Sequence, residues 1–344
     1  MRILSVAWEC PIGWYGGLGV YVSKLLPEMA KGNEVDHYCL HGDIPSGEAV
    51  DYFGVRVIKP EDVLVDKNQS VFYKTAIALA SHLHKHLGRY DAVIGHDAHS
   101  SLAILYANQI GLKTVFSAHL FSSTGIEFDA VHRADAVVAN SKLLAKSIAE
   151  ATNVMGEKLK VVYPAPPYPP SREYHKVMRQ KPQIVIPSRF QLNKDPSKVL
   201  QQLSEAKKKA DFSVLVFGKG SEFFKLPDWI SVAGTVSEEQ KLDLYRSADL
   251  VLMVGFPEPF GLVSLEAISQ GTPVLVPSLS GSAEVLPEDS VYTLDNLAEK
   301  ILWLLEDRKR LAELWEKQKE SRIMKRTWKD VWSEYEALAK EKEG

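Results

Sequence analysis

Short apolar runs alternate with amphipathic segments along most of the chain. The apolar runs predict buried strands, and the segments with apolar residues at helical spacing predict helices. In the first half the predicted strands are Ile3–Ala7, Glu34–Leu40, Val55–Ile58, Ala92–Gly95, Thr114–Ala118 and Ala136–Ala139. The predicted helices there are Gly19–Lys31, Ser70–Leu87, Ser100–Ile110, Ile126–Arg133 and Lys142–Ala151. This alternation predicts a parallel sheet that is covered by helices on both faces.

A proline-rich segment, Tyr163–Ser171, divides the pattern into two similar halves. It holds five prolines and can continue neither a sheet nor a helix. The later predicted strands are Gln183–Pro187, Ser213–Phe217, Trp229–Ala233, Ala248–Val254 and Pro273–Pro277. The later predicted helices are Ser197–Ala210, Glu238–Ser247, Leu262–Gln270, Leu294–Asp307 and an amphipathic terminal one, Thr327–Lys342. We therefore predict two Rossmann-like, doubly wound α/β domains, 1–165 and 182–326, joined by a linker over 166–181 and followed by a terminal helix in 327–344.

Composition is ordinary for a globular protein and excludes several classes. The chain has 344 residues, 25% of them charged, and a net charge of -3, which gives no argument for binding nucleic acid or an anionic membrane. No apolar run is long enough for a transmembrane helix, and the first apolar run reads as a strand and not as a signal peptide. Cys10 and Cys39 are too few for a disulfide scaffold or a cysteine-based zinc site, and their number fits a reducing, cytoplasmic location.

Two glutamates eight positions apart, Glu258 and Glu266, form the most informative motif. The first should lie on a loop above a strand and the second inside the following helix. The residues between them that open this helix are Phe260, Gly261, Leu262 and Val263. Free N–H groups at a helix N-terminus favour phosphate, so a carboxylate on either side suits a sugar nucleotide. The alternative is an ordinary strand–loop–helix unit with two solvated acids.

This motif resembles the E-x7-E signature of retaining glycosyltransferases with the GT-B fold, chiefly glycosyltransferase family 4 and glycogen-synthase-like enzymes. The resemblance extends over nearly the whole chain but rests on five or six short motifs. It implies two facing domains, with Glu258 on the transferred sugar and Glu266 on the nucleotide ribose. It also implies a terminal helix that crosses back onto the first domain. Trp328 and Trp332 would be its anchors, or else simple core residues.

A glycine-rich loop, Tyr15–Val20, follows the first predicted strand. Its glycines allow a ligand to approach the backbone closely and leave N–H groups free for anionic oxygens. The loop resembles the glycosyltransferase loop written G-G-x-G or G-G-L, which implies that Gly17 contacts the donor. The loop lacks the G-x-G-x-x-G fingerprint, so we expect no nicotinamide cofactor, and no other cofactor either. The rings of Trp14 and Tyr15 can stack on an acceptor sugar or close the core.

Two cations, Arg189 and Lys194, lie five positions apart after the predicted strand that ends at Pro187. A departing nucleoside diphosphate needs positive charge, which these side chains can supply without a metal. The family carries an Arg and a Lys at this spacing, whereas the alternative is two solvated cations. Gly218 follows the next strand, where the family often has a G-x-G near the nucleotide. The loop Gly281–Glu284 is similar to a family G-G-x-x-E loop, but Ser282 replaces a glycine and leaves its role open.

Several histidines follow predicted strands of the first domain. The segment His96–His99 resembles the H-D-x-H segment of glycogen synthases, and His119 resembles a family histidine that approaches the transferred sugar. By this resemblance His119 bonds the sugar 6-hydroxyl, Asp97 orients His119 or contacts the acceptor, and His96 contacts the acceptor. We discount a metal because two histidines and an aspartate within four residues cannot easily converge on one ion. A D-x-D motif is absent as well.

The sequence therefore predicts a retaining, metal-independent hexosyltransferase that uses a UDP-, ADP- or GDP-hexose and a carbohydrate acceptor. The histidine segment and the glycine-rich loop favour glucose and α-glucan synthesis, although the chain is short for a glycogen synthase. The alternatives are a mannosyl- or galactosyltransferase for a small or lipid acceptor, a nucleotide-sugar epimerase and a two-lobed sugar-binding protein. The sequence makes no prediction of oligomeric state.

Overall fold

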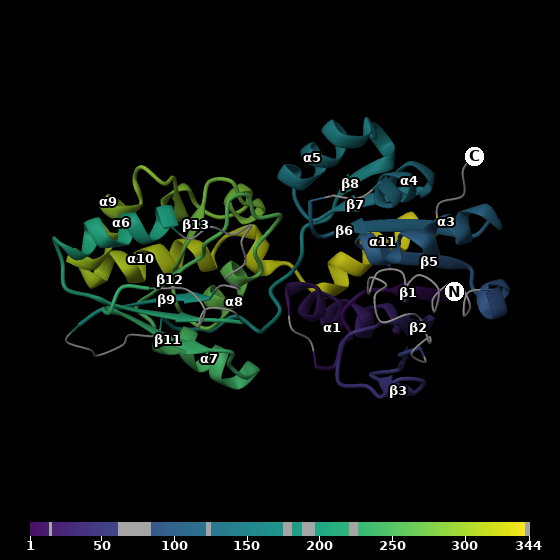
Figure 1. Ribbon diagram of the computed structural model, residues 1–344, viewed down its shortest axis with the longest axis horizontal. Coiled ribbons are helices and arrows are strands. Elements are labelled where there is room, and N and C mark those ends of the chain that lie inside the picture. Colours follow the sequence, from purple (N-terminus) through teal and green to yellow (C-terminus); the bar gives the residue numbers. More distant parts are fainter. Residues whose placement is uncertain are drawn as a thin grey trace. The chain divides into compact units, whose positions relative to one another are not determined.

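The computed structural model describes residues 1–13, 16–60, 84–121, 125–174, 181–187, 197–219 and 226–340. The chain divides into two compact units (Figure 1). The first comprises Met1–Pro164 together with Thr327–Gly344, and the second comprises Ala165–Arg326.

The first unit is built on an eight-stranded sheet. Its strands are β1 (Arg2–Val6), β2 (Glu34–Tyr38), β3 (Ala49–Tyr52), β4 (Val55–Ile58), β5 (Ala92–His96), β6 (Lys113–Ala118), β7 (Ala136–Ala139) and β8 (Leu159–Val161). They lie in the order β3-β4-β2-β1-β5-β6-β7-β8, and every pair is parallel except β3 with β4. The helices of this unit are α1 (Gly17–Met29), α3 (Ser101–Gln109), α4 (Gly125–Arg133), α5 (Lys142–Thr152) and α11 (Trp328–Lys340). The central strands are buried on both faces, as helix-covered parallel sheets require.

The second unit has a six-stranded, wholly parallel sheet. Its strands are β9 (Gln183–Pro187), β10 (Ser213–Phe217), β11 (Ile230–Gly234), β12 (Leu250–Leu252), β13 (Val274–Pro277) and β14 (Val291–Tyr292). They lie in the order β11-β10-β9-β12-β13-β14. The helices are α6 (Ser197–Lys207), α7 (Glu238–Ser247), α8 (Val263–Ser269), α9 (Leu297–Glu306) and α10 (Arg308–Lys319). The fold class expected from the sequence, two Rossmann-like parallel-sheet domains, is confirmed.

The prediction missed four elements, β3, β8, β14 and α10. The three strands are short, and β3 and β8 are only partly buried, so their sequences lack a continuous apolar run. Helix α10 follows α9 directly, because Asp307 is both the C-cap of α9 and the N-cap of α10. The helix predicted over 70–87 lies for the most part outside the described residues.

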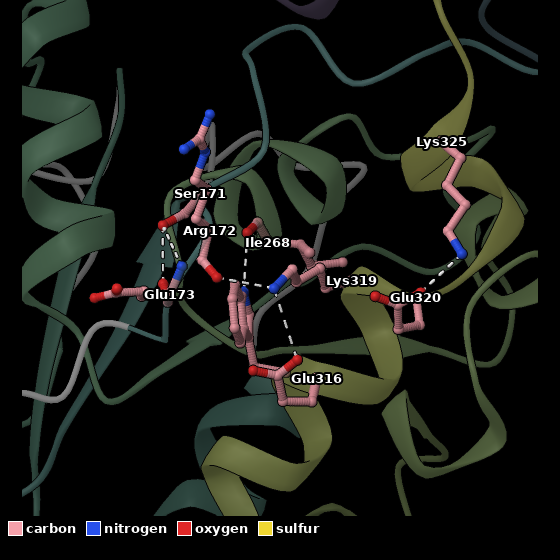
Figure 2. Close-up of polar contacts among 9 residues, drawn as sticks. Ser171, Arg172, Glu173, Ile268, Glu316, Lys319, Glu320 and Lys325 are labelled. Atoms are coloured by element: carbon pink, nitrogen blue, oxygen red, sulfur yellow. Dashed lines mark hydrogen bonds and ion pairs between the residues drawn. The ribbon is translucent and has the colours of Figure 1, made fainter.

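The segment predicted to be the interdomain linker, 166–181, belongs in its described part to the second unit. The backbone N–H of Ser171 donates to the carbonyl of Ser269 at the end of α8, over 2.8 Å. Figure 2 shows the Lys319 ammonium of α10 donating to the Arg172 carbonyl at 2.9 Å. The indole of Trp315, below Lys319, donates to the carbonyl of Ile268 at 3.0 Å. This segment therefore helps to hold the C-terminal end of α8.

The terminal helix α11 belongs to the first unit, where it packs on α1, β5 and β6 (Figure 1). Trp328 and Trp332 are both buried, and the ring of Trp328 meets that of Tyr21 edge-on at 5.0 Å. Both tryptophans are thus core residues of the first unit.

Cys10 and Cys39 form a disulfide that joins the segments after β1 and β2. The small number of cysteines fits a reducing compartment, whereas a disulfide does not favour one. The number alone carried no information on whether the two thiols pair. Among the described helices, none combines the length and the apolarity that crossing a bilayer requires.

Candidate active site

Asp97 lies at the carboxyl end of β5 and fixes the backbone that follows β6. Its Oδ1 accepts hydrogen bonds from the N–H of His119 at 2.6 Å and of Leu120 at 3.1 Å. Burial raises the pKa of the Asp97 carboxyl to about 7, against the effect of the His119 N–H and with a further rise from Glu127. The backbone of Asp97 has a φ of 58°, which is uncommon for a residue with a side chain. Asp97 therefore holds the main chain of His119 and not its ring.

The ring of His119 is held by two neighbouring side chains. Its Nε2 lies 3.0 Å from Nδ1 of His96 and 3.0 Å from Oγ of Ser117. Burial lowers the pKa of His119 to about 3 and lowers that of His96 well below its ordinary value. Both rings are therefore neutral, and His119 is suited to neutral hydrogen bonding. His96, expected on the acceptor, is completely buried and reaches His119 instead.

The three residues that superficially suggested a metal site have separate partners. His96 bonds to His119, and Asp97 bonds to backbone N–H groups. The ring of His99 packs on that of Trp8 at 4.4 Å, and Trp8 also stacks on His41 at 5.6 Å. Across the parts of the chain that the structure describes, no group of three or more His, Cys, Asp or Glu side chains is arranged to hold a metal.

The N-terminus of α1 is occupied by a carboxylate of the protein itself. Oε2 of the buried Glu9 accepts from the N–H of Gly16 at 3.0 Å and of Gly19 at 2.7 Å. The expectation that this loop offers free N–H groups to a ligand is therefore wrong for these two glycines. Gly17 between them is exposed, with open space where a side chain would stand. Trp14 and Tyr15 lie outside the described residues.

The loop that carries Glu258 is held by the segment after β13. The N–H of Glu258 donates to the carbonyl of Leu279 at 2.9 Å, and the N–H of Gly281 donates to the carbonyl of Glu258 at 3.1 Å. The N–H of Ser282 donates to the carbonyl of Phe260 at 2.9 Å. The sequence left the role of the loop Gly281–Glu284 open. The structure shows that this loop supports the loop that carries Glu258.

Gly261 is required by the geometry of the turn between the two glutamates. Its φ is +89°, and a Cβ at this position would lie 2.4 Å from the sulfur of Met253. Among the described residues, no hydrogen bond engages the backbone N–H of Gly261, Leu262 or Val263. These three N–H groups are thus available where α8 begins.

Glu266 is buried in α8, and α7 supplies its partners. Lys241 Nζ lies 3.1 Å from Oε1 of Glu266, and the Tyr245 hydroxyl donates to Oε2 at 2.9 Å. Lys241 also pairs with Glu238 at 3.0 Å. Burial acts to lower the pKa of Lys241, but the two carboxylates outweigh it and the pKa is raised. Burial, reinforced by Glu266, raises the pKa of Tyr245 well above its ordinary value. The Glu266 carboxylate is therefore fixed and charge-compensated.

Three further residues were predicted to bind the donor: Gly218, Arg189 and Lys194. The N–H of Gly218 donates to the carbonyl of Gly234 at 2.7 Å, so it serves the sheet edge. Arg189 and Lys194 lie outside the described residues.

Sequence reasoning missed the supporting residues Glu9, Ser117, Lys241, Tyr245 and Tyr335. The last three act across 21 or more positions of the sequence. It also missed Asn140, although a polar residue directly after a strand was a usable signal. The pairing of Ala118 with Ala139 places Asn140 beside His119 at the sheet edge. Asn140 is 8% exposed, and its Oδ1 has no hydrogen-bond partner among the described residues.

Comparison with known proteins accounts for both units. Residues 15–167 match the Glycosyltransferase Family 4 model, and residues 170–321 match the Glycosyl transferases group 1 model. An uncharacterised glycosyltransferase of Methanocaldococcus jannaschii is 23% identical over 88% of this chain and 87% of its own length. A D-inositol 3-phosphate glycosyltransferase of Xylanimonas cellulosilytica is 26% identical over 84% of this chain and 81% of its own.

The fold has a close counterpart among solved structures. Sucrose-phosphate synthase of Thermosynechococcus elongatus superposes with a TM-score of 0.78 at 17% identity, covering 98% of each chain. Three findings point to the same family. They are the buried and loop glutamates of the second unit, the histidine site of the first unit and the two adjoining family matches. The chain is a glycosyltransferase of family 4, with the GT-B fold of two Rossmann-like domains.

Proposed function

We propose that this glycosyltransferase moves a hexose, with glucose the expected sugar, from a nucleoside-diphosphate sugar to an acceptor hydroxyl, with retention of the α configuration. The observation that carries the proposal is the fixed, buried carboxylate of Glu266, eight positions after the loop carboxylate of Glu258. Because Lys241 and Tyr245 leave further lone pairs of Glu266 unused, its oxygens can accept from vicinal ribose hydroxyls. Glu258, half-buried on its loop, would hold the sugar hydroxyls.

The chemical step needs negative charge to be stabilised on the leaving diphosphate. The N–H groups of Gly261, Leu262 and Val263 would hold the distal phosphate, and Arg189 and Lys194 would neutralise the rest. The acceptor oxygen attacks the anomeric carbon on the face from which the diphosphate leaves, and the leaving phosphate oxygen takes the acceptor proton. No metal is assigned to this step, and activity in excess EDTA is the corresponding expectation.

Two acceptor classes have support of different kinds. The resemblance of His96–His99 to glycogen synthases favours an α-glucan, and this is the acceptor that we propose. A small phosphorylated polyol is the second candidate, because the relative named D-inositol 3-phosphate glycosyltransferase matches most of this chain.

The test is diphosphate release from UDP-, ADP- and GDP-hexoses, with maltooligosaccharide or inositol phosphate as acceptor. Glu258→Gln and Glu266→Gln should each lose most of the activity, whereas Glu239→Gln, an exposed α7 position, should keep it. Stimulation by only one acceptor decides between the two classes. An α-linked product supports retention, and a β-linked product from an α-linked donor overturns it. Failure to bind or cleave any of these donors would refute the proposal as a whole.

A further inference from the structure

A chain of buried hydroxyl groups connects the terminal helix α11 to the ring of His119. The Tyr21 hydroxyl of α1 donates to the Tyr335 hydroxyl of α11 at 3.1 Å. The Tyr335 oxygen lies 2.6 Å from Oγ of Ser117, which in turn lies 3.0 Å from Nε2 of His119. All four residues belong to the first unit, and all are at most 9% exposed.

The proton count along this chain favours one protonation state of the His119 ring. Each hydroxyl carries a single proton. Tyr21 gives its proton to the Tyr335 oxygen, so the proton of Tyr335 is left for Ser117, although either atom of the Tyr335–Ser117 pair can be the donor. When Tyr335 is the donor, the proton of Ser117 is directed at Nε2 of His119, which then accepts. A neutral imidazole carries one N–H, so the proton of His119 lies on Nδ1.

His96 gives independent support for this assignment. Its Nδ1 also faces Nε2 of His119 at 3.0 Å, and its own Nε2 is buried without a hydrogen-bond partner among the described residues. If His119 donated from Nε2, His96 would accept at Nδ1 and carry its proton on this buried, unpartnered Nε2. Buried N–H groups without acceptors are rarer than buried acceptors without donors. The two rings together therefore favour an accepting Nε2 on His119.

We propose that Tyr335 and Ser117 are positioning residues that hold His119 as the Nδ1-protonated tautomer, so that the ring presents an N–H donor to an oxygen of the donor sugar. Among the described residues, no hydrogen bond engages Nδ1 of His119. The catalytic part of this inference rests on the proposed function, whereas the tautomer is a property of the protein without substrate. The terminal helix thereby contributes to the site without contacting substrate.

The tautomer can be read by NMR on protein with ¹⁵N-labelled histidine, with the His119 resonances assigned by comparison with His119→Gln. Wild-type protein should show His119 protonated on Nδ1. Ser117→Ala and Tyr335→Phe should each give a mixture containing the Nε2-protonated form. Ser117→Thr, which keeps a hydroxyl, should restore the wild-type pattern. Trp332→Phe is the packing control on α11 and should leave the tautomer unchanged.

The kinetic counterpart is a lower kcat with little change in donor KM. We expect Ser117→Ala and Tyr335→Phe to lower kcat about tenfold or more. In the other tautomer His119 no longer directs its N–H at the donor sugar, so the transition state loses that hydrogen bond. Ser117→Thr should recover most of it. An Nε2-protonated His119 in the wild type, or an unchanged tautomer in both variants, overturns the proposal. Absence of activity on every donor would instead refute the proposed function and leave the tautomer result standing.

Discussion

The buried carboxyl of Asp97 should make the stability of the first unit depend on pH. Replacing Asp97 with asparagine removes the charge but keeps an oxygen that can accept from the N–H groups of His119 and Leu120. The φ of 58° with a ψ of -176° is unfavourable for aspartate and asparagine alike, so the substitution leaves the backbone strain unchanged. The substitution therefore tests the ionisation of the group and leaves its geometry in place.

The sign and the size of the effect follow from the raised pKa of Asp97. Burial is the largest cause of the rise from 3.8 to about 7, and the carboxylates of Glu127 and Glu9 add to it. Because the folded pKa lies above the unfolded one, the stabilising contribution is complete below the unfolded value and is lost as the pH rises through about 7. At about 1.36 kcal/mol for each pH unit, the wild type should lose about 3 kcal/mol between pH ~5 and ~8 that Asp97→Asn retains.

Urea unfolding at several pH values, read by hydrogen exchange in peptides from β5 and β6, measures this difference for the first unit alone. Asp51→Asn, at an exposed position of the same unit, is the matched control and should show no such trend. If Asp97 acts only by orienting His119, the asparagine variant should also keep kcat within about tenfold of the wild type. A difference in unfolding free energy between Asp97→Asn and wild type that stays constant from pH ~5 to ~8 would refute the reasoning.

Three further predictions concern the other buried features. Lys241→Met should destabilise the second unit by about 3–5 kcal/mol, because it leaves a buried carboxylate without its cation; in urea unfolding, adding Glu266→Gln should recover at least half, and simple additivity would contradict the pairing. Gly261→Ala should lower stability by about 1–3 kcal/mol through strain at positive φ and reduce donor binding in calorimetry, and a variant with normal stability and binding would contradict the tight turn. Thiol titration of the denatured chain should find no thiol before reduction and two after it, from Cys10 and Cys39, and reduction should cost the first unit about 3–4 kcal/mol; two reactive thiols without reductant would contradict the disulfide.

The fold was predictable where local signals agreed. Strands β4, β7, β9 and β10 were predicted with their observed bounds, because each is a short segment rich in β-branched or other apolar residues. Helix α7 was also predicted at its observed bounds, and a capping box of Ser237 and Gln240 marks its start. Helix α10 was missed because Asp307 ends one helix and caps the next, with no glycine or proline to separate them. Strand β3 was missed because it is a short strand at the edge of the sheet whose residues are exposed or half-buried, so no apolar run marks it.

The candidate site was predictable only where the local sequence marks the end of a strand. Parallel strands end at one edge of a sheet, so polar residues after such strands, including Asp97 and His119, could be recognised from the sequence. The capture of the α1 N-terminus by Glu9 could not, because the same glycine-rich loop is compatible with a bound anion or with a buried carboxylate. Only the path of the chain decides between them.

Both units fix a functional side chain with a helix that is remote in the sequence. Glu266 receives its partners from α7, 21 and 25 positions earlier. The ring of His119 is connected through Ser117 to a tyrosine of α11, which lies 218 positions away from Ser117. The strand ends determine where the polar groups lie. Helix α7 supplies the cation that compensates the charge of Glu266, and helix α11 takes part in the hydrogen bonds that orient the ring of His119. Residues such as Lys241 and Tyr335 should therefore change turnover or donor affinity without touching substrate. The contact of Lys241 with Glu266 and that of Tyr335 with Ser117 are the routes by which we expect them to act.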